Sequence, residues 1–322
     1  MSSKLEKAVR SHTGLQGAFS QDEVLTDRER IIFIIFMERS CYLILVASAL
    51  VTTSALFANT EPLNEPKMAE RFVEMDAAGN WEERFFDDGV GTREEGNWNN
   101  GKWQEKWFLD GEIASVRNTQ KGLLLTAGPR WRDDAHHMVL WTHQQFEGDL
   151  KIEYSFTRAD FEEGCVVILY IQATGSGEDG FAEDISKWND YRAVPTMSTY
   201  FKNMHTYHIS YATNGPHVYE GGDYVRARRY DPAIGGLRGS EMVPDYTDTG
   251  LWEPGVEHQV TVIKNNLELM MKVEAPNQTK YFHFINDKHP PITHGRIGLR
   301  QMFTRSSFYK NFKVSESIHE ID

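Results

Sequence analysis

Short stretches in which apolar and polar side chains alternate dominate the chain from about residue 112 onward. Such alternation is typical of strands that bury one face. Ten stretches predict strands, at 122–127, 137–141, 150–157, 165–172, 205–212, 258–264, 267–274, 281–285, 295–302 and 308–314. Asn265 and Asn266 predict a hairpin turn between the sixth and seventh of them. The pattern indicates an all-β antiparallel sandwich.

The remaining segments are less regular. Residues 59–80 read as a short helix or an arm, and residues 81–111 as loops and short strands. Residues 173–204 and 213–257 are predicted to be long insertions, which in a compact domain usually carry function. We expect residues 59–322 to form a single carbohydrate-active sandwich domain.

The amino-terminal region predicts export. Residues 41–58 carry no charge, Arg39 precedes them, and Ala58 ends the run. This order is typical of a signal peptide, here residues 37–58 with Met37 as the start, so residues 1–36 would not belong to the true protein. A transmembrane helix is the alternative, because the run is just long enough to span a bilayer. The prediction is a periplasmic or secreted protein with no stable membrane span after cleavage.

Charge and composition narrow the class of ligand. The formal net charge is -13, which argues against nucleic acid as a partner, because a nucleic-acid backbone requires a basic face. Aromatic residues make up 12% of the chain, a content that suits β-structure and sugar-binding surfaces. An anionic ligand would therefore depend on a local arginine cluster.

Several familiar catalytic motifs are missing. The chain contains no GxxxxGK[ST], GxSxG, HExxH or CxxC string, which argues against nucleotide-dependent and zinc protease chemistry. Jelly-roll glycosidases carry carboxylates in an ExDxxE pattern. The nearest string, residues 178–183, has Gly180 where the middle Asp should stand. The sequence thus lacks the pattern of a retaining glycosidase.

Histidine and aromatic residues are the first candidates for a polar site. Strand alternation places His137 and Trp141 on one sheet face. It also places His208 and Ser210 on one face of their strand, whereas Tyr211 points to the opposite, core side. A strand with His and Ser away from the core predicts the floor of a polar cleft, although solvated polar residues would show the same pattern.

Arginines form the second group of candidates. Arg226, Arg228 and Arg229 lie within residues 224–230, in the second predicted insertion. Arginine pairs bidentately with carboxylate or sulfate, so this cluster predicts an anion site. Arg300 and Gln301 alternate along another strand, and only one of them can face a cleft.

The signals for metal binding are weak. His136, His137 and His143 match no strong metal motif, so we predict no catalytic metal and no cofactor. Asp87 and Asp88, followed by Gly89, leave a structural calcium ion open.

Five strings of the sequence resemble a known family. They are HMVLW (137–141), GED (177–179), HISY (208–211), GRIGLRQM (295–302) and YKNFKV (309–314). In these residues the stretch from about 122 to 314 is similar to the family of the Bacillus protein YesU. The resemblance implies a concanavalin/lectin-like jelly-roll sandwich linked to the degradation of acidic polysaccharides. It also implies an oligosaccharide dehydratase that removes water from a terminal uronic acid, as exported relatives do on ulvan fragments.

This implied reaction assigns roles to the candidate residues. A β-elimination next to a carboxylate needs a cation for the charge, a base for the C5 proton and an acid for the leaving hydroxyl. Histidine suits the base because it titrates near neutral pH. The expected base is His137 or His208, and the expected acid is Tyr200 or Tyr211. The expected contacts to the acidic oligosaccharide are Trp141, Glu178, Asp179, Arg226, Arg228, Arg229, Arg300 and Gln301.

Two other function classes stay open at this stage. A non-catalytic carbohydrate-binding sandwich would show exposed tryptophan rows on a shallow groove, with His137 and His208 far from it. An enzyme would bring both histidines to one pocket with the arginines. A glycoside hydrolase with an unrecognised carboxylate pair is the third reading, and the sequence leaves the oligomeric state open.

Overall fold

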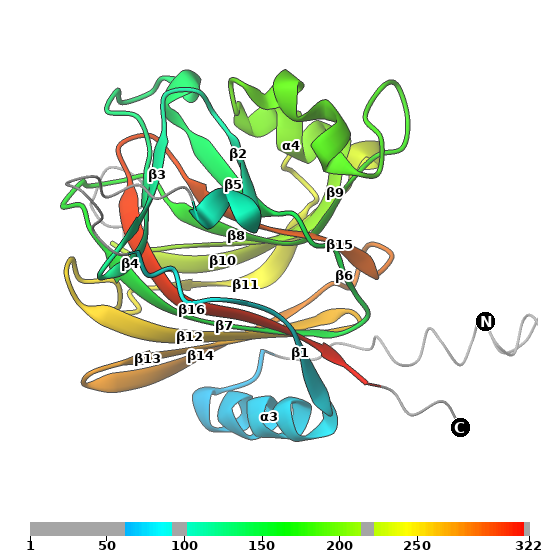
Figure 1. Cartoon of the computed structure of the whole chain (residues 1–322). Helices are drawn as coiled ribbons and strands as arrows, with labels where there is room; N and C mark the ends of the chain where they lie inside the picture. Colours follow the sequence, from blue (N-terminus) through cyan, green and yellow to red (C-terminus); the bar gives the residue numbers. More distant parts are fainter. Residues whose placement is uncertain (1–61, 92–101, 214–221, 319–322) are drawn as a thin grey trace, which may run out of the picture. The chain divides into compact units, whose positions relative to one another are not determined.

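Two antiparallel sheets stack against each other in the computed structural model (Figure 1), which describes residues 62–91, 102–213 and 222–318. All of these residues belong to one compact unit, Glu61–Asp322. The expectations for residues 1–36 and 37–58 lie outside the described residues. No helix in the described ranges is long and apolar enough to cross a membrane.

The first sheet, called sheet 1, contains the carboxy-terminal strand as one of its interior strands. Its strand order is β14 (Gln278–Ile285), β13 (Glu268–Ala275), β12 (Glu257–Asn265), β7 (Leu150–Arg158), β16 (Ser306–Ser317), β4 (Gly122–Thr126) and β3 (Ser115–Thr119), and β1 (Trp81–Asp87) also pairs with β16. Asn265 pairs with Glu268, and Asn266 takes the left-handed conformation with a φ of 50°. The predicted hairpin turn at Asn265 and Asn266 is therefore confirmed.

The second sheet, called sheet 2, contains most of the candidate residues. Its strand order is β11 (Glu241–Thr247), β10 (Tyr224–Tyr230), β9 (Met204–Tyr211), β8 (Val167–Gly175), β15 (His294–Gln301), β5 (Met138–Thr142) and β2 (Trp107–Asp110), and β6 (Phe146–Glu147) also pairs with β15. All ten predicted strands are confirmed. The interpretation of residues 213–257 as an insertion was wrong in part, because β10 and β11 lie within it and extend sheet 2.

The core between the sheets follows from strand alternation. Leu150, Ile152 and Phe156 of β7 point into it from sheet 1, and Val167 and Leu169 of β8 point into it from sheet 2. All five side chains are buried. Burial of each such side chain stabilises the fold by about 1.5–3 kcal/mol relative to exposure. The face of sheet 2 that points away from sheet 1 is called here the distal face.

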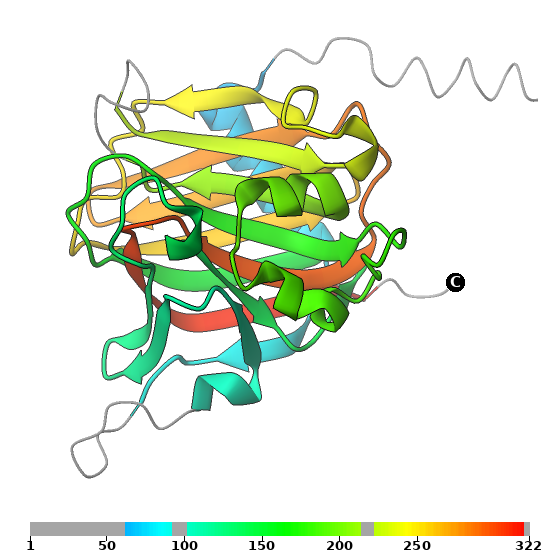
Figure 2. The ribbon, with the colours of Figure 1, turned by 90° about the horizontal axis from the view of Figure 1, so that it is seen from above.

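Short helices cover the distal face (Figure 2). They are η5 (Ile185–Arg192) and α4 (Met197–Asn203), both within the predicted insertion at 173–204. Tyr200 and Trp188 from these helices pack in one cluster with Trp141 and Tyr170 of the sheet. The insertion thus covers part of the distal face and shields its side chains from solvent. The other short helices are η3 (Lys102–Glu105), η4 (Asp134–His136) and η6 (Pro232–Ile234).

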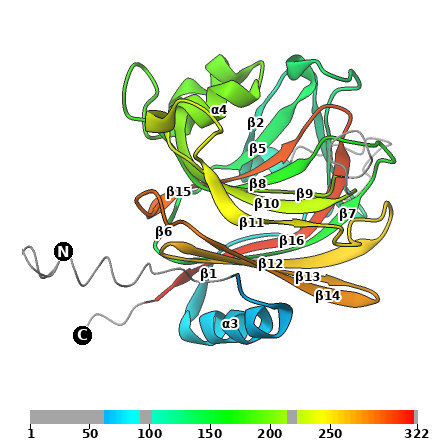
Figure 3. The same cartoon turned by 180° about the vertical axis from the view of Figure 1, so that it is seen from behind.

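The longest helix, α3 (Glu65–Ala78), packs under the outer face of sheet 1 (Figure 3). The Asn64 side chain accepts a hydrogen bond from the Lys67 N–H and caps its first turn. Met68, Phe72 and Met75 recur at spacings of four and three residues, so one face of the helix is apolar and buried. Of the two expectations for residues 59–80, a short helix or an arm, the helix is confirmed, and it has 14 residues.

Candidate functional site

Two rows of side chains cross the distal face of sheet 2. Strand registers align one residue from each of five neighbouring strands, because facing residues on paired strands point to the same side. The first row is Trp141, Gly298, Tyr170, His208 and Arg228. The second row is Val139, Arg300, Ile168, Ser210 and Arg226. The first row combines aromatic and basic groups, and the second combines apolar, hydroxyl and basic groups.

Stacked aromatic rings form the floor of this face. The ring centroids of Trp141 and Tyr170 lie 5.4 Å apart at an interplanar angle of 18°. Tyr200 from α4 stacks on Tyr170 at 5.8 Å and 5°. A Cβ added at Gly298 would come within 2.4 Å of the Trp141 ring, so only glycine leaves room for that ring.

A buried carboxylate, Asp110, ties this floor to the covering helices. Its Oδ2 accepts hydrogen bonds from Trp141 Nε1 at 2.8 Å, Tyr200 Oη at 2.8 Å and Arg192 Nε at 2.6 Å. Its Oδ1 accepts one from Asn189 Nδ2 at 2.6 Å. With four donors the carboxylate is fully satisfied, and it fixes the positions of both rings. The sequence analysis missed Asp110.

Arg300 is a buried cation with no counterion among the residues that the structure describes. Its side chain is fully buried, and no ion pair among the described residues involves it. Nη2 donates to His137 Nδ1 at 2.7 Å and to the Pro195 carbonyl at 2.6 Å, whereas Nε and Nη1 have no hydrogen-bond partner. A buried charge normally has a partner. Arg300 therefore points to an anion-binding position.

His137 lies beside Arg300 as a neutral imidazole. Burial, and then the charge of Arg300, lower its pKa to about 3. Because the guanidinium can only donate, Nδ1 accepts and the proton of His137 stays on Nε2. This Nε2 is buried and has no partner. His137 thus offers an N–H donor rather than a free lone pair.

His208 differs from His137 in what its Nδ1 contacts. Nδ1 lies 2.5 Å from the Tyr230 hydroxyl, and Nε2 is buried without a partner. Burial lowers the pKa of His208, and the charges of Arg228, Arg300 and Arg226 lower it further. Burial likewise raises the pKa of Tyr230, so the phenol stays protonated. A neutral imidazole next to a protonated phenol can accept one proton and donate another.

Three predicted site residues lie on the opposite side of sheet 2. The Tyr211 hydroxyl bonds to the Tyr154 hydroxyl at 2.9 Å in the core, and Gln301 donates to the Tyr309 hydroxyl at 3.1 Å. Arg229 donates to the Pro290 carbonyl and lies over the Tyr207 ring. Strand alternation separates all three from the distal face. Of the pair Arg300 and Gln301, it is Arg300 that faces the site.

Other predicted residues have positions that limit their roles. The hydroxyl of Tyr200 already donates to Asp110, so its proton points away from a ligand at Arg300. Glu178 and Asp179 line a separate cleft of about 350 Å³ with Lys202 and His205. The structure therefore does not bring these two acids together with the buried histidines.

Arg226 and Arg228 lie at the solvent edge of the distal face. Arg226 pairs with Asp245 at 2.7 Å, and Arg228 pairs with Glu241 at 3.1 Å. Their side chains are 10% and 13% exposed, whereas Arg300 and His137 are at most 1% exposed. The two arginines mark the side on which the face meets solvent.

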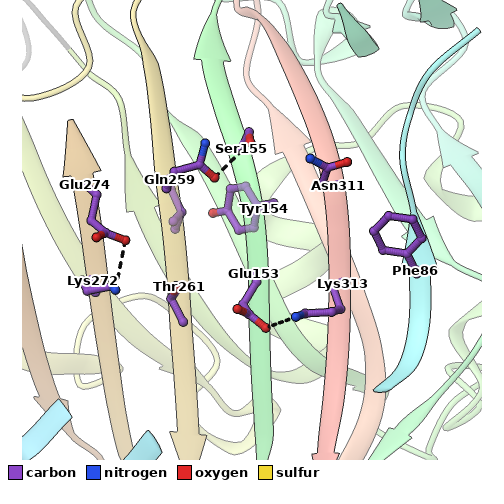
Figure 4. Close-up of a pocket in the computed structure, with 11 residues that line it drawn as sticks. Phe86, Glu153, Tyr154, Ser155, Gln259, Thr261, Lys272, Glu274, Asn311 and Lys313 are labelled. Carbon is purple, nitrogen blue, oxygen red and sulfur yellow. Dashed lines mark hydrogen bonds and ion pairs between the residues drawn. The ribbon is translucent and has the colours of Figure 1, made fainter. Parts of the chain in front are cut away.

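A second hollow of about 350 Å³ lies on the outer face of sheet 1 (Figure 4). Its charged side chains pair with one another, Lys313 with Glu153 at 2.6 Å and Lys272 with Glu274 at 2.9 Å. Each cation there already has a carboxylate. For an anionic ligand, the distal face of sheet 2 is therefore the better candidate.

Comparisons with known proteins place the fold and the family. Residues 97–314 match a family described as a domain of unknown function, DUF1961. The chain belongs to this family. No curated protein is similar enough to count as a match. The DUF1961 match covers about two thirds of the chain and includes all residues of both rows, as well as Asp110.

Solved structures agree with the sandwich. A Bacillus subtilis protein of unknown function with a galectin-like fold matches with a TM-score of 0.50 and 17% identity, covering 73% of this chain and 100% of that one. Peanut lectin with a nonamer peptide matches with a TM-score of 0.46 and 11% identity, and the match covers 74% of this chain and 100% of that one. The lectin UEA-II complexed with galactose matches with a TM-score of 0.44 and 7% identity, and the match covers 73% of this chain and 98% of that one. The predicted concanavalin/lectin-like β-sandwich is confirmed for this DUF1961 protein.

The described part of the DUF1961 chain shows little that suits a metal ion. In the three described ranges, no group of three or more His, Cys, Asp or Glu side chains is arranged to hold one. At the position considered for calcium, Asp87 accepts hydrogen bonds from the Gly89 N–H and from Trp107 Nε1, and Asp88 accepts one from the Val90 N–H. The two carboxylates thus accept hydrogen bonds from nearby N–H groups, and those from Gly89 and Val90 are typical of a turn.

Proposed function

We propose that this DUF1961 protein is a carbon–oxygen lyase that removes water by β-elimination from the terminal uronic acid of an acidic oligosaccharide. The observation that carries the proposal is Arg300, a buried guanidinium without a counterion in the described part of the chain, together with two neutral histidines on the same face. The uronate carboxylate would supply the missing negative charge. The resemblance to exported relatives that act on ulvan fragments supports the same reaction.

Arg300 holds the carboxylate of the substrate in this proposal. One of its unbonded groups, Nε or Nη1, donates to a carboxylate oxygen, and the guanidinium stabilises the charge that spreads onto the carboxylate when C5 loses its proton. His137 adds a further donor through Nε2–H. The covering helices keep water from these groups, which strengthens each electrostatic contact.

His208 is the base. With its Nδ1–H donated to the Tyr230 oxygen, the lone pair of Nε2 is free to take the C5 proton. The electron pair of the C5–H bond forms the C4–C5 double bond, and the C4–O bond breaks. His137 is the weaker candidate for this role, because Arg300 holds its proton on Nε2.

The protonated His208 is also the acid, in place of the expected Tyr200 or Tyr211. The C4 oxygen is bonded to the carbon next to C5, so the Nε2–H of the imidazolium can reach it and donates its proton to the leaving 4-hydroxyl, which departs as water. Tyr230 accepts the Nδ1–H throughout and keeps the lone pair of the neutral imidazole on Nε2. After the step the histidine is neutral again, and the products are water and an unsaturated uronate. Tyr170, which stacks within the floor and lies edge-on to His208 at 5.7 Å, positions the imidazole.

The proposal also includes location and partners. Residues 37–58 predict export, so the protein would meet sulfated algal oligosaccharides in the periplasm or outside the cell. The reaction needs no cofactor, because substrate, base, acid and cation account for every atom.

A non-catalytic carbohydrate-binding module is the second candidate. The galectin-like fold of the Bacillus subtilis protein supports it, and Arg300 could bind a uronate without turnover. A glycoside hydrolase is less well supported, because that chemistry uses a pair of carboxylates. Asp110, the buried acid on the distal face, already accepts four hydrogen bonds.

One experiment separates these candidates. The purified protein is incubated with uronate-ended, sulfated oligosaccharides while the ultraviolet absorbance of a conjugated double bond is followed, with mass spectrometry alongside. A rise in absorbance with loss of one water supports the dehydratase. A rise with chain cleavage indicates a chain-cleaving lyase, and binding without any rise indicates the non-catalytic module.

A further inference from the structure

An exposed tryptophan lies next to the buried site. Trp131 is 43% exposed, and its ring meets Phe303 edge-on at 5.2 Å. Phe303 stacks on His137 at 4.6 Å and 20°, and His137 contacts Arg300. A continuous set of ring contacts therefore leads from the protein surface to the proposed carboxylate position.

An unpaired arginine accompanies this tryptophan. Arg132 is exposed and takes part in no ion pair of the described ranges, whereas its neighbour Arg130 lies 3.8 Å from Asp133. Burial raises the pKa of Cys165 to about 12, and the nearby charges of Arg305, Arg132 and Arg300 oppose this rise. Arg132 and Arg300 thus both act electrostatically on the same thiol.

The loop that carries Trp131 is held in place by the fold. The Gly128 N–H donates to the His136 carbonyl at 2.9 Å, and the Arg130 N–H donates to His136 Nδ1 at 3.3 Å. The Thr304 N–H donates to the Gly128 carbonyl at 3.0 Å and anchors the loop to the segment after β15. A surface aromatic on an anchored loop binds a ring without a large entropy cost.

We propose that Trp131 and Arg132 form a second sugar subsite, which binds the ring next to the uronate and an anionic substituent on it. The inference rests on the proposed function, because it takes the uronate at Arg300 as the first subsite. Trp131 offers one face to a sugar ring, and Arg132 offers a free guanidinium to a sulfate. The subsite would give the protein a preference for charged oligosaccharides over single uronic acids.

Binding titrations test this subsite without relying on turnover. The ligands are a methyl glycoside of glucuronic acid, a disaccharide with sulfate on the ring next to the uronate, and the same disaccharide without sulfate. We expect Trp131→Ala to weaken the affinity for the sulfated disaccharide about tenfold and to leave the affinity for the methyl glycoside unchanged. Trp131→Phe should restore part of the affinity. Arg132→Ala should abolish the preference for the sulfated over the unsulfated disaccharide.

Phe86→Ala is the matched control, because Phe86 is also 43% exposed but belongs to sheet 1. It should change no affinity. Three results overturn the subsite: equal weakening of single ring and disaccharide by Trp131→Ala, no weakening of either, or no binding of the disaccharide by the intact protein. The expected binding pattern without any elimination would refute the lyase and leave the subsite standing. Elimination together with equal affinity for all three ligands would refute the subsite and leave the lyase standing.

Discussion

Nη2 of Arg300 lies 2.7 Å from Nδ1 of His137, and this contact assigns different roles to the two histidines of the distal face. A guanidinium donates and never accepts, so the proton of His137 stays on Nε2. His208 has a phenol instead of a cation at its Nδ1 and is free to present a lone pair at Nε2. The sequence left both histidines open as the base, and the hydrogen bonds favour His208.

Replacing Arg300 by methionine should greatly weaken binding of acidic oligosaccharides without destabilising the fold. The guanidinium is buried with no carboxylate partner among the described residues, so its removal ends an uncompensated desolvation cost. We expect the Tm to stay level or rise, and the Kd for a uronate-ended oligosaccharide to weaken about a hundredfold. Thermal melting and isothermal titration measure the two effects.

Arg192→Met is the matched control for this substitution. Arg192 is equally buried, but its Nε lies 2.6 Å from Asp110 Oδ2. Its removal leaves a buried carboxylate unpaired and should cost about 3–5 kcal/mol of folding free energy. Should Arg300→Met prove as destabilising as Arg192→Met, Arg300 would be a structural cation and the anion site would be wrong.

His208→Gln should lower turnover far more than it lowers binding. Glutamine keeps polar atoms near Tyr230 but cannot take a proton, so we expect a rate loss of about 10²–10⁴-fold. His137→Gln should lose less, because His137 contributes one donor and the placement of Arg300. Initial rates of double-bond formation measure both. Tyr211→Phe, which removes a hydroxyl in the core between the sheets, should keep the wild-type rate. A comparable rate loss in Tyr211→Phe would contradict the assignment.

Most of the sandwich could be predicted because its strands bury one face and alternate cleanly. The exception among the site-bearing strands is β10, which carries three arginines and was interpreted as part of a loop. Its pattern was nonetheless alternating. Val225 and Ala227 point into the core, whereas Arg226 and Arg228 lie on the distal face. A strand that carries charged residues on a covered face is difficult to predict from the hydrophobicity pattern.

The site could be predicted only where alternation determines the direction of a side chain. That rule placed His137 with Trp141 and separated His208 from Tyr211, as the structure has them. It could not find Asp110, whose four donors come from positions 31 to 90 residues away along the chain. Nor could it find that the Tyr200 hydroxyl points to Asp110, because the direction of a side chain on a short insertion helix depends on tertiary contacts.

Gly298→Ala should disturb the aromatic floor. The new Cβ would lie 2.4 Å from the Trp141 ring, which stacking on Tyr170 and the bond to Asp110 hold in place. Overpacking of this kind costs about 1–3 kcal/mol. Urea unfolding measures the loss, and tryptophan fluorescence reports a shifted ring. Gly236→Ala, at a position with nothing within 4 Å of the new Cβ, is the control and should change neither. Unchanged unfolding in Gly298→Ala would show that the floor is not tightly packed.

The buried histidines should make the fold less stable in mild acid. The pKa of His137 is about 3 in the folded chain against 6.5 for a free side chain, and burial lowers the pKa of His208 as well. The unfolded chain therefore binds more protons than the folded chain below about pH 6.5. The free energy of unfolding should fall as the pH falls from 6.5 towards 3, by up to about 1.4 kcal/mol per pH unit for each histidine.

Urea unfolding at pH 7.5, about pH 6 and about pH 5 measures this slope. His137→Gln should reduce it, since one titrating group is gone, whereas His143→Gln, at an exposed histidine, should not. The rate of elimination should also fall as the pH falls, because His208 acts as a base only when it is neutral. The acid limb of the rate profile should therefore lie below pH 6.5, and a limb at or above that value would mean that a different group takes the C5 proton.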